Sequence, residues 1–195
     1  MAKKEKTSST LLVVDPSDTG DWSKAQQRDV RPTTTAGWLL WASAAPDAPR
    51  VVETFGTLVT LDGPLTGQDT DALKKSATGA DTALVAVPAG VGPYEAACAA
   101  WFRSALVCLH DCGVPKVIVA CDNMRDSSVN YSQGRFKIME HENLDYAKRA
   151  GYEDGAVSCV PIDHWTGENL YKLSANMSWY KGDALIDIFA DLRPR

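Results

Sequence analysis

The stretch Val157–Gly182, VSCVPIDHWTGENLYKLSANMSWYKG, decides the fold, because its residue order is too specific to follow from composition. Its apolar start, which ends at Pro161, predicts a buried strand, and the Gly167 and Asn169 that follow predict a loop leaving the strand's carboxyl end. The Ser-Ala-Asn run at 174–176 then falls on a loop beyond that strand. Ligands of open α/β sheets bind at such loops, so this loop would lie against a nucleotide base if the chain binds one.

The rest of the chain alternates between strand and helix patterns. We expect strands over Thr10–Val14, Val51–Leu61 (a strand or hairpin), Thr82–Val87, Pro115–Ala120 and Ala156–Val160. We expect helices over Asp71–Thr78, Tyr94–Cys112, Phe136–Ala150 and Ala184–Leu192. This alternation predicts an α/β fold in three layers, with a mostly parallel sheet and helices on both faces.

The opening stretch resembles the end of the GTP-binding (G) domain of eukaryotic translation elongation factor 1-alpha. The family pattern there is V-P-I-S-G-W-x-G-(D/E)-N, then S-A-N-M-x-W-(F/Y)-K-G, and most of it is kept. Ala80-Asp81, the run from Ala89 to Ala96, and Tyr131-Ser132-Gln133 also match, so the resemblance covers roughly residues 80–182. The resemblance implies a Ras-like G domain with the P-loop NTPase fold.

Length and composition are those of one well-buried domain, at 195 residues and 45% hydrophobic. We expect a basic tail over residues 1–9, with Lys3, Lys4 and Lys6, and a single pseudo-G domain over 10–195 that lacks the family's two further β-barrel domains. The net charge of −5 argues against a nucleic-acid site. No apolar run reaches the ~20 residues of a membrane span. We expect a cytoplasmic protein or one associated with the cytoskeleton.

The five cysteines form no disulfide framework, which fits a reducing compartment. Cys108, His110 and Cys112 fall near a helix end and Cys121 follows the next strand, but the paired spacings of zinc sites are missing. We therefore expect no metal, and we interpret these cysteines as small buried apolar residues.

The resemblance places a P-loop, G-x-x-x-x-G-K-(S/T), directly after the first strand, where this chain departs from the pattern. Asp15 stands at the first glycine, Pro16 removes an amide donor, Gly20 keeps the second glycine, Asp21 replaces the lysine and Trp22 replaces the magnesium-binding hydroxyl. A unit-charge contact at ~4 Å is worth about 4 kcal/mol near a protein surface, so replacing the lysine by an aspartate weakens phosphate binding by roughly twice that amount. The whole binding free energy of a micromolar ligand is only about 8 kcal/mol. We therefore expect that a triphosphate does not bind there.

The family's D-A-P-G-H-(R/K)-D segment aligns with residues 62–68. Asp62 and Pro64 remain, while Leu65 and Thr66 replace the glycine that senses the γ-phosphate and the histidine that places water. Asp62 could still bind a metal, but without a partner hydroxyl we favour a strand-end carboxylate.

The base-reading motif Asn-Lys-x-Asp aligns with residues 122–125, which puts Arg125 at the aspartate that accepts from guanine. Arginine only donates, and a one-residue slip would bring Asp126 into place. His164 stands where the family has a glycine, and we interpret it as a surface loop histidine. The Ser-Ala-Asn run alone is intact, and because it survives alone it can be interpreted simply as a structural loop. The residues assigned to the degenerate nucleotide sites are Gly20, Asp21, Trp22, Asp62, Asn123, Asp126, Ser174, Ala175 and Asn176.

Trp22, Trp38 and Trp41 cluster in the sequence where nucleotide and switch elements would lie. They either fill the vacated pocket or form a protein-binding face, and both interpretations stay open.

The sequence therefore predicts a non-catalytic pseudo-GTPase without cofactor. We expect it to act as a protein-interaction or structural subunit whose partners are an exchange factor, the ribosome, or cytoskeletal or axonemal proteins. The alternative is a residual translation factor or GTP sensor that binds GTP and magnesium. A small-molecule binder that uses the altered pocket is a third hypothesis.

Overall fold

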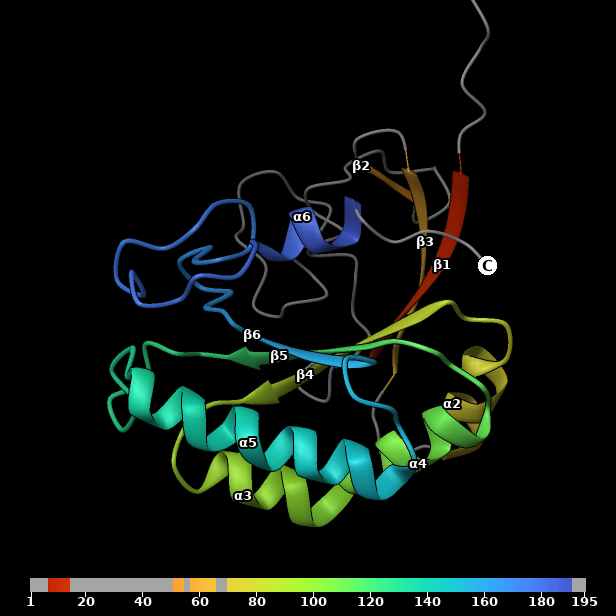
Figure 1. Ribbon diagram of the computed structural model, residues 1–195, viewed down its shortest axis with the longest axis horizontal. Coiled ribbons are helices and arrows are strands. Elements are labelled where there is room, and N and C mark those ends of the chain that lie inside the picture. Colours follow the sequence, from red (N-terminus) through yellow and green to blue (C-terminus); the bar gives the residue numbers. More distant parts are fainter. Residues whose placement is uncertain (1–6, 15–50, 55–56, 66–69, 191–195) are drawn as a thin grey trace, which may run out of the picture.

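A six-stranded sheet forms the centre of the molecule, with the strand order β2-β3-β1-β4-β5-β6 (Figure 1). The computed structural model describes residues 7–14, 51–54, 57–65 and 70–190. The strands are β1 Thr7–Val14, β2 Val51–Thr54, β3 Thr57–Leu65, β4 Thr82–Pro88, β5 Val117–Asp122 and β6 Val157–Pro161. β2 and β3 form an antiparallel hairpin, and the other pairings are parallel. The predicted, mostly parallel sheet is confirmed.

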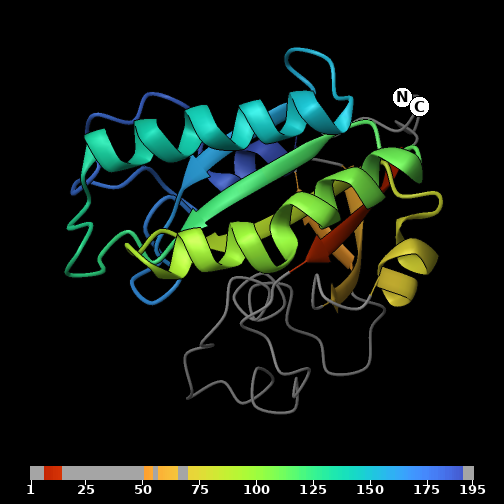
Figure 2. The ribbon, with the colours of Figure 1, turned by 90° about the horizontal axis from the view of Figure 1, so that it is seen from below.

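Helices lie on both faces of this sheet, as predicted (Figures 1 and 2). They are α2 Thr70–Ala77, α3 Pro93–Ala97, the π-helical turn η1 Cys98–Phe102, α4 Arg103–Asp111, α5 Gln133–Ala150 and α6 Leu185–Ala190. α3, η1 and α4 follow one another without a break, and this long helix lies beside α5 under one face of the sheet, while α6 lies on the other.

The main core lies between the sheet and the two long helices. β5 is buried along its whole length and β4 up to its last residue, because both of their faces are covered, which is why their sequences read as continuous apolar runs. Ala97, Trp101, Ala105 and Cys108, predicted to share one side of the long helix, are all buried. The prediction that the cysteines are small buried residues is confirmed for all but the half-buried Cys112.

Helix α5 has defined ends that set the position of the loops around it. The Ser132 hydroxyl accepts a hydrogen bond from the Arg135 amide at 3.2 Å, so the helix begins three residues before the Phe136 that the apolar pattern indicates. Gly151 closes the helix with φ 107°, and a Cβ on it would come within 2.6 Å of the His110 ring. Only glycine satisfies both the dihedral and the contact at this position.

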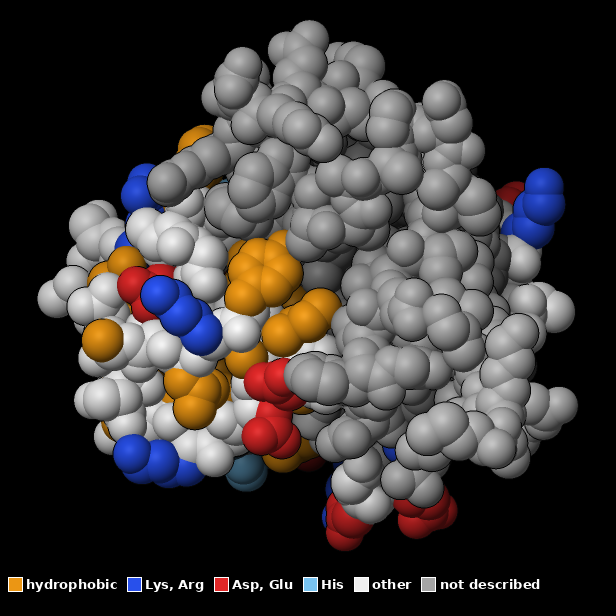
Figure 3. Space-filling view, turned by 90° about the horizontal axis from the view of Figure 1, so that it is seen from above, with side chains coloured by type: hydrophobic (Ala, Val, Ile, Leu, Met, Phe, Trp, Pro, Cys, Tyr) orange, Lys and Arg blue, Asp and Glu red, His pale blue; other side chains and the backbone are white. Residues whose placement is uncertain are grey.

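The face that carries α6 exposes hydrophobic side chains of the described residues (Figure 3). Trp165, Tyr171 and Leu173 are exposed in the long segment between β6 and α6. Over the residues that the structure describes, no helix has the length and hydropathy needed to cross a bilayer.

Candidate functional site

The carboxyl ends of β5 and β6 lie side by side, and the loops that leave them are joined by hydrogen bonds. The amide of Met124 donates to the Ile162 carbonyl at 3.2 Å, and the amide of Arg125 donates to Asp163 Oδ2 at 3.1 Å. Asp163 is fully buried, and its other carboxylate oxygen accepts from the amide and hydroxyl of Thr166. The two loops therefore form one rigid ledge at the edge where ligands of parallel sheets bind.

A buried histidine–aspartate pair lies at the centre of this ledge. His164 Nδ1 is 2.6 Å from Asp122 Oδ2, and the two side chains are 7% and 9% exposed. Asp122 Oδ1 also accepts from the backbone amides of Asn123 at 2.6 Å and His164 at 3.1 Å. The carboxylate is thus held by three donors in a buried setting, where a removed partner costs most.

The prediction of a surface loop histidine at 164 is wrong. The pairing of β5 and β6 continues past Pro161, because the amide of Ile162 donates to the Cys121 carbonyl at 2.9 Å. Residues 162–164 are consequently buried like the strand before them. The Asp122 at the end of the neighbouring strand is the sequence signal that identifies a partner for His164.

Arg125 and Trp165 form the exposed rim of the ledge. The guanidinium carbon lies 5.6 Å from the centroid of the Trp165 ring, which is 41% exposed. The geometry is that of a cation–π contact between neighbouring loops.

Asp126 is engaged within its own loop. Its Oδ1 accepts from the Ser128 hydroxyl at 2.6 Å and from the Ser128 amide at 2.8 Å, and these hydrogen bonds lower the pKa of Asp126. The carboxylate packs against Gly90, where an added Cβ would lie 3.3 Å from it. Asn123 makes the turn before it, with φ 62°, a conformation that asparagine tolerates.

The Ser-Ala-Asn run forms a tight turn fastened to the preceding loop. The Ser174 hydroxyl accepts from the amides of Asn176 at 3.0 Å and Met177 at 3.1 Å, and the Ser174 amide donates to Asn169 Oδ1 at 2.7 Å. The Asn176 side chain donates to Glu168, and Ala175 is exposed. Within the described residues, no hydrogen bond joins this turn to residues 122–126. Its internal bonding accounts for the run as a structural loop.

Comparison with known proteins finds relatives in translation. The chain is 33% identical to elongation factor 1-alpha of Blastocystis hominis over 131 residues, which are 64% of this chain and 30% of that protein. It is 34% identical to elongation factor 1-alpha of Euglena gracilis over 129 residues, 64% of this chain and 29% of that protein. The chain carries an elongation factor 1-alpha-like G domain. It spans about 30% of the length of these relatives, and no protein-family model matches it.

Solved structures show the same G-domain fold. Sup35 complexed with GDP superposes with a TM-score of 0.71 at 18% identity, covering 96% of this chain and 45% of that one. The Saccharomyces cerevisiae Ski7 GTPase-like domain, bound to GDP and inorganic phosphate, superposes with a TM-score of 0.64 at 14% identity, covering 95% of this chain and 49% of that one.

Two motifs of the family pattern align with the residues of the ledge. The family's Ser-Gly-Trp falls on Asp163, His164 and Trp165, directly after β6, and its Asn-Lys-x-Asp begins at Asp122. His164 thus occupies the position of the family's glycine, and Asp122 the position of the family's asparagine. These two side chains contact each other. Residues 163–165 were not among the predicted site residues, because the Ser-Ala-Asn run was expected to lie against a base.

The other predicted site residues either lie outside the described part of the chain or lie away from the ledge. Gly20, Asp21, Trp22, Trp38 and Trp41 lie outside the described residues. Asp62 lies within β3, opposite Leu12 of β1, and the strand runs on to Leu65. Asp62 is therefore not the strand-end carboxylate that we expected.

Proposed function

We propose that this G domain is a pseudo-GTPase, which neither holds nor hydrolyses GTP and which works through contacts with other proteins. The observation that carries the proposal is the buried pair of His164 and Asp122 at the position where the family reads the base. A base that entered would displace the imidazole and leave the carboxylate buried without it.

The cost of that displacement is large compared with nucleotide affinity. Removing the partner of a buried carboxylate costs about 3–5 kcal/mol where it leaves that charge uncompensated. This loss corresponds to between about a hundredfold and a few thousandfold in affinity. The sequence of the degenerate P-loop adds to it, since Asp21 places a negative charge where phosphate needs a positive one.

The proposed work is that of a non-catalytic subunit in a larger assembly. The relatives are elongation factors, which favours a translation-linked assembly with the ribosome or an exchange factor as partner. A cytoskeletal or axonemal assembly is the second choice. A pull-down of the tagged protein from its own cell, before and after a high-salt wash, distinguishes them by whether ribosomal or structural proteins survive.

A residual nucleotide binder is the alternative with an observation behind it. The Ski7 domain is described as GTPase-like, and it is bound to GDP and inorganic phosphate. The test of the proposal must therefore include the diphosphate as well as the triphosphate.

The decisive test is titration of the chain with fluorescent GDP and GTP in the presence of magnesium. We expect no saturable binding up to the high micromolar range, and Sup35, whose solved structures hold GDP and GMPPNP, serves as the positive control. Saturable micromolar binding that Asp21→Ala alters, and that the exposed Glu153→Ala leaves unchanged, would overturn the proposal. Phosphate release measured in the same samples separates binding from hydrolysis.

A further inference from the structure

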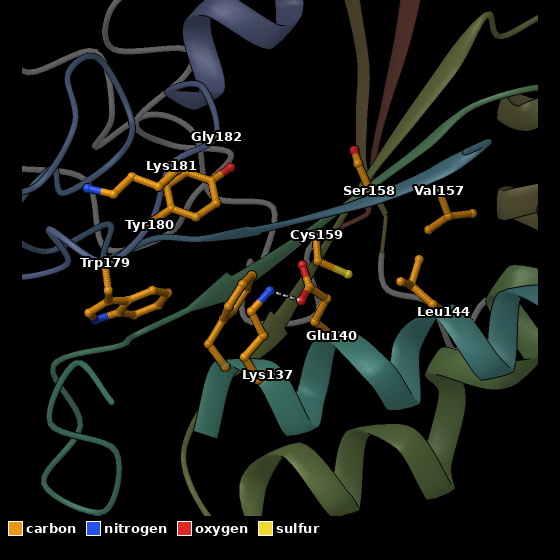
Figure 4. A pocket seen from close by; sticks show the side chains of 11 residues that line it. Lys137, Glu140, Leu144, Val157, Ser158, Cys159, Trp179, Tyr180, Lys181 and Gly182 are labelled. Carbon is orange, nitrogen blue, oxygen red and sulfur yellow. Dashed lines mark hydrogen bonds and ion pairs between the residues drawn. The ribbon is translucent and has the colours of Figure 1, made fainter. Parts of the chain in front are cut away.

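A groove of about 450 Å³ lies along the outer edge of β6, between α5 and the segment 179–182 (Figure 4). β6 is the last strand of the described sheet on this side. Ser158 and Cys159 are neighbours in β6 and point to opposite faces of the sheet, yet both line the groove. The groove therefore crosses the strand's edge, and it belongs to the size class of ligand sites.

The backbone of β6 presents hydrogen-bonding groups to this groove. The Ala156 carbonyl and the Ile162 amide bond to β5, so even-numbered residues direct their backbone groups inward and Val157 and Cys159 direct theirs outward. No hydrogen bond among the described residues uses these outward groups. Such an edge is a template for another strand.

The edge is closed at its other end. Pro161 has no amide hydrogen, and its carbonyl accepts from Asn169 Nδ2 at 2.8 Å. The open part of the edge is thus limited to Val157–Cys159, where the groove lies.

The walls of the groove are suited to side chains of a particular chemistry. The Trp179 ring is held in place by two contacts. Its Nε1 donates to the Tyr131 carbonyl at 2.9 Å, and its ring centroid lies 5.5 Å from that of Phe136. At the opposite end, Leu144 is 42% exposed beside Val157. Apolar side chains would bury area at both ends.

The charges on the groove favour an acidic partner. Lys137 and Glu140 pair with each other on α5, as the dashed line in Figure 4 marks. The ammonium of Lys181 bonds to the Ser178 carbonyl at 2.7 Å and has no carboxylate partner among the described residues. The groove thus carries one uncompensated positive charge on a chain whose net charge is −5.

We propose that the groove binds an extended peptide segment of a partner protein, which adds as a strand to Val157–Cys159, places apolar side chains against Trp179 and Leu144, and sets a carboxylate near Lys181. This is strand addition, in which backbone bonds supply affinity and alternate side chains supply specificity. The inference deepens the interaction role proposed above and rests on it for the partner being a protein.

A second copy of this chain fits the groove less well than a peptide does. A twofold interface through β6 would bring two concave surfaces together and leave space between them unfilled, which forfeits packing. A single strand with side chains pointing into the groove fills that space.

The test begins with random linear peptides displayed on phage and selected against the full chain. We expect the enriched sequences to alternate apolar residues and to carry an Asp or Glu near one end. Synthetic copies, labelled with fluorescein, are titrated by anisotropy with the unmodified chain and with two α5 variants. Leu144→Glu at the groove should weaken binding by about tenfold or more. Ile138→Glu, which is on the same helix and more exposed than Leu144 but lies outside the groove, should leave binding unchanged.

A backbone readout tests strand addition directly. Hydrogen exchange followed by NMR should show the amides of Val157 and Cys159 becoming protected when peptide is added, while those of Ser158 and Val160, already bonded to β5, change little. N-methylation of the peptide residues whose amides point toward β6 should abolish binding. N-methylation of the residues between them, whose amides point away, should leave binding intact.

Three outcomes would overturn the inference. These are the failure of any peptide to be enriched, equal weakening by the two α5 substitutions, and protection of Val157 and Cys159 in a dimer that light scattering detects without peptide. None of these outcomes changes the result of the nucleotide titration. Peptide binding therefore tests the groove, and nucleotide binding separately tests the pseudo-GTPase proposal.

Discussion

Strand β6 and the loop that continues it to His164 have two halves, which differ in whether their polar groups are bonded within the chain. In the carboxyl half, Asp163 and His164 are buried, and the neighbouring Asp122 accepts from two backbone amides and pairs with the His164 ring. At the amino half, the outward backbone groups of Val157 and Cys159 face a groove. The difference teaches that one strand of this fold can have its polar groups bonded within the chain in one half and left unbonded by the described residues in the other.

The largest expected effect comes from opening the closed half. His164→Ala removes the partner of a buried carboxylate, so we expect a loss of about 3–5 kcal/mol in the free energy of unfolding, measured by urea denaturation. The double variant Asp122→Asn/His164→Gly should recover much of this loss, because an amide is neutral and still accepts from the backbone. A loss in His164→Ala below about 1 kcal/mol, the value of a surface pair, would show that the pair is not buried as described.

The boundary between the halves is Asn169, which closes the edge at Pro161. Asn169→Ala removes the donor to the Pro161 carbonyl and the acceptor of the Ser174 amide, and we expect about 1–3 kcal/mol of destabilisation in chemical denaturation. Asn169→Asp keeps the acceptor of the Ser174 amide but sets a buried carboxylate oxygen against the Pro161 carbonyl, so it should cost at least as much as Asn169→Ala. An Asn169→Asp variant that is more stable than Asn169→Ala would show that the side-chain amide does not donate to Pro161.

A smaller effect is expected at the Ser-Ala-Asn turn. Ser174→Ala leaves the amides of Asn176 and Met177 without their acceptor, which should cost about 1 kcal/mol, as for a lost helix cap. Differential scanning calorimetry measures it, with the exposed Ser178→Ala as control. A change in nucleotide binding with unchanged stability would contradict the structural interpretation of this turn.

The smallest effect concerns Asp126, beside the closed half. The Ser128 hydrogen bonds lower the pKa of Asp126 below its ordinary 3.8. A lowered carboxyl pKa contributes stability that is present above 3.8 and is lost as the pH falls through the folded-state value. Ser128→Ala should return the pKa towards 3.8, which an NMR titration of the Asp126 carboxyl follows. An unchanged pKa would mean that Ser128 is not its cause.

The fold could be predicted from the sequence because its signals are local. The apolar runs of β4 and β5, the one-sided pattern of the long helix and the Gly151 at the end of α5 each follow from neighbouring residues. The site could not be predicted in this way. His164 and Asp122 are far apart in the chain, and a polar residue after a strand is exposed by default, so only the pairing of β5 with β6 makes them partners.

The groove was likewise beyond local reasoning. Which β6 amides face outward depends on the register with β5, and the aromatic wall comes from a segment that returns to the strand only after a long excursion.

The mutual dependence of His164 and Asp122 has a consequence for evolutionary paths. Changing His164 first leaves a buried carboxylate without its side-chain partner, whereas changing Asp122 first leaves the imidazole beside a neutral amide that can still accept its hydrogen bond. The order in which the two residues change therefore decides how much stability is lost on the way to an asparagine and a glycine.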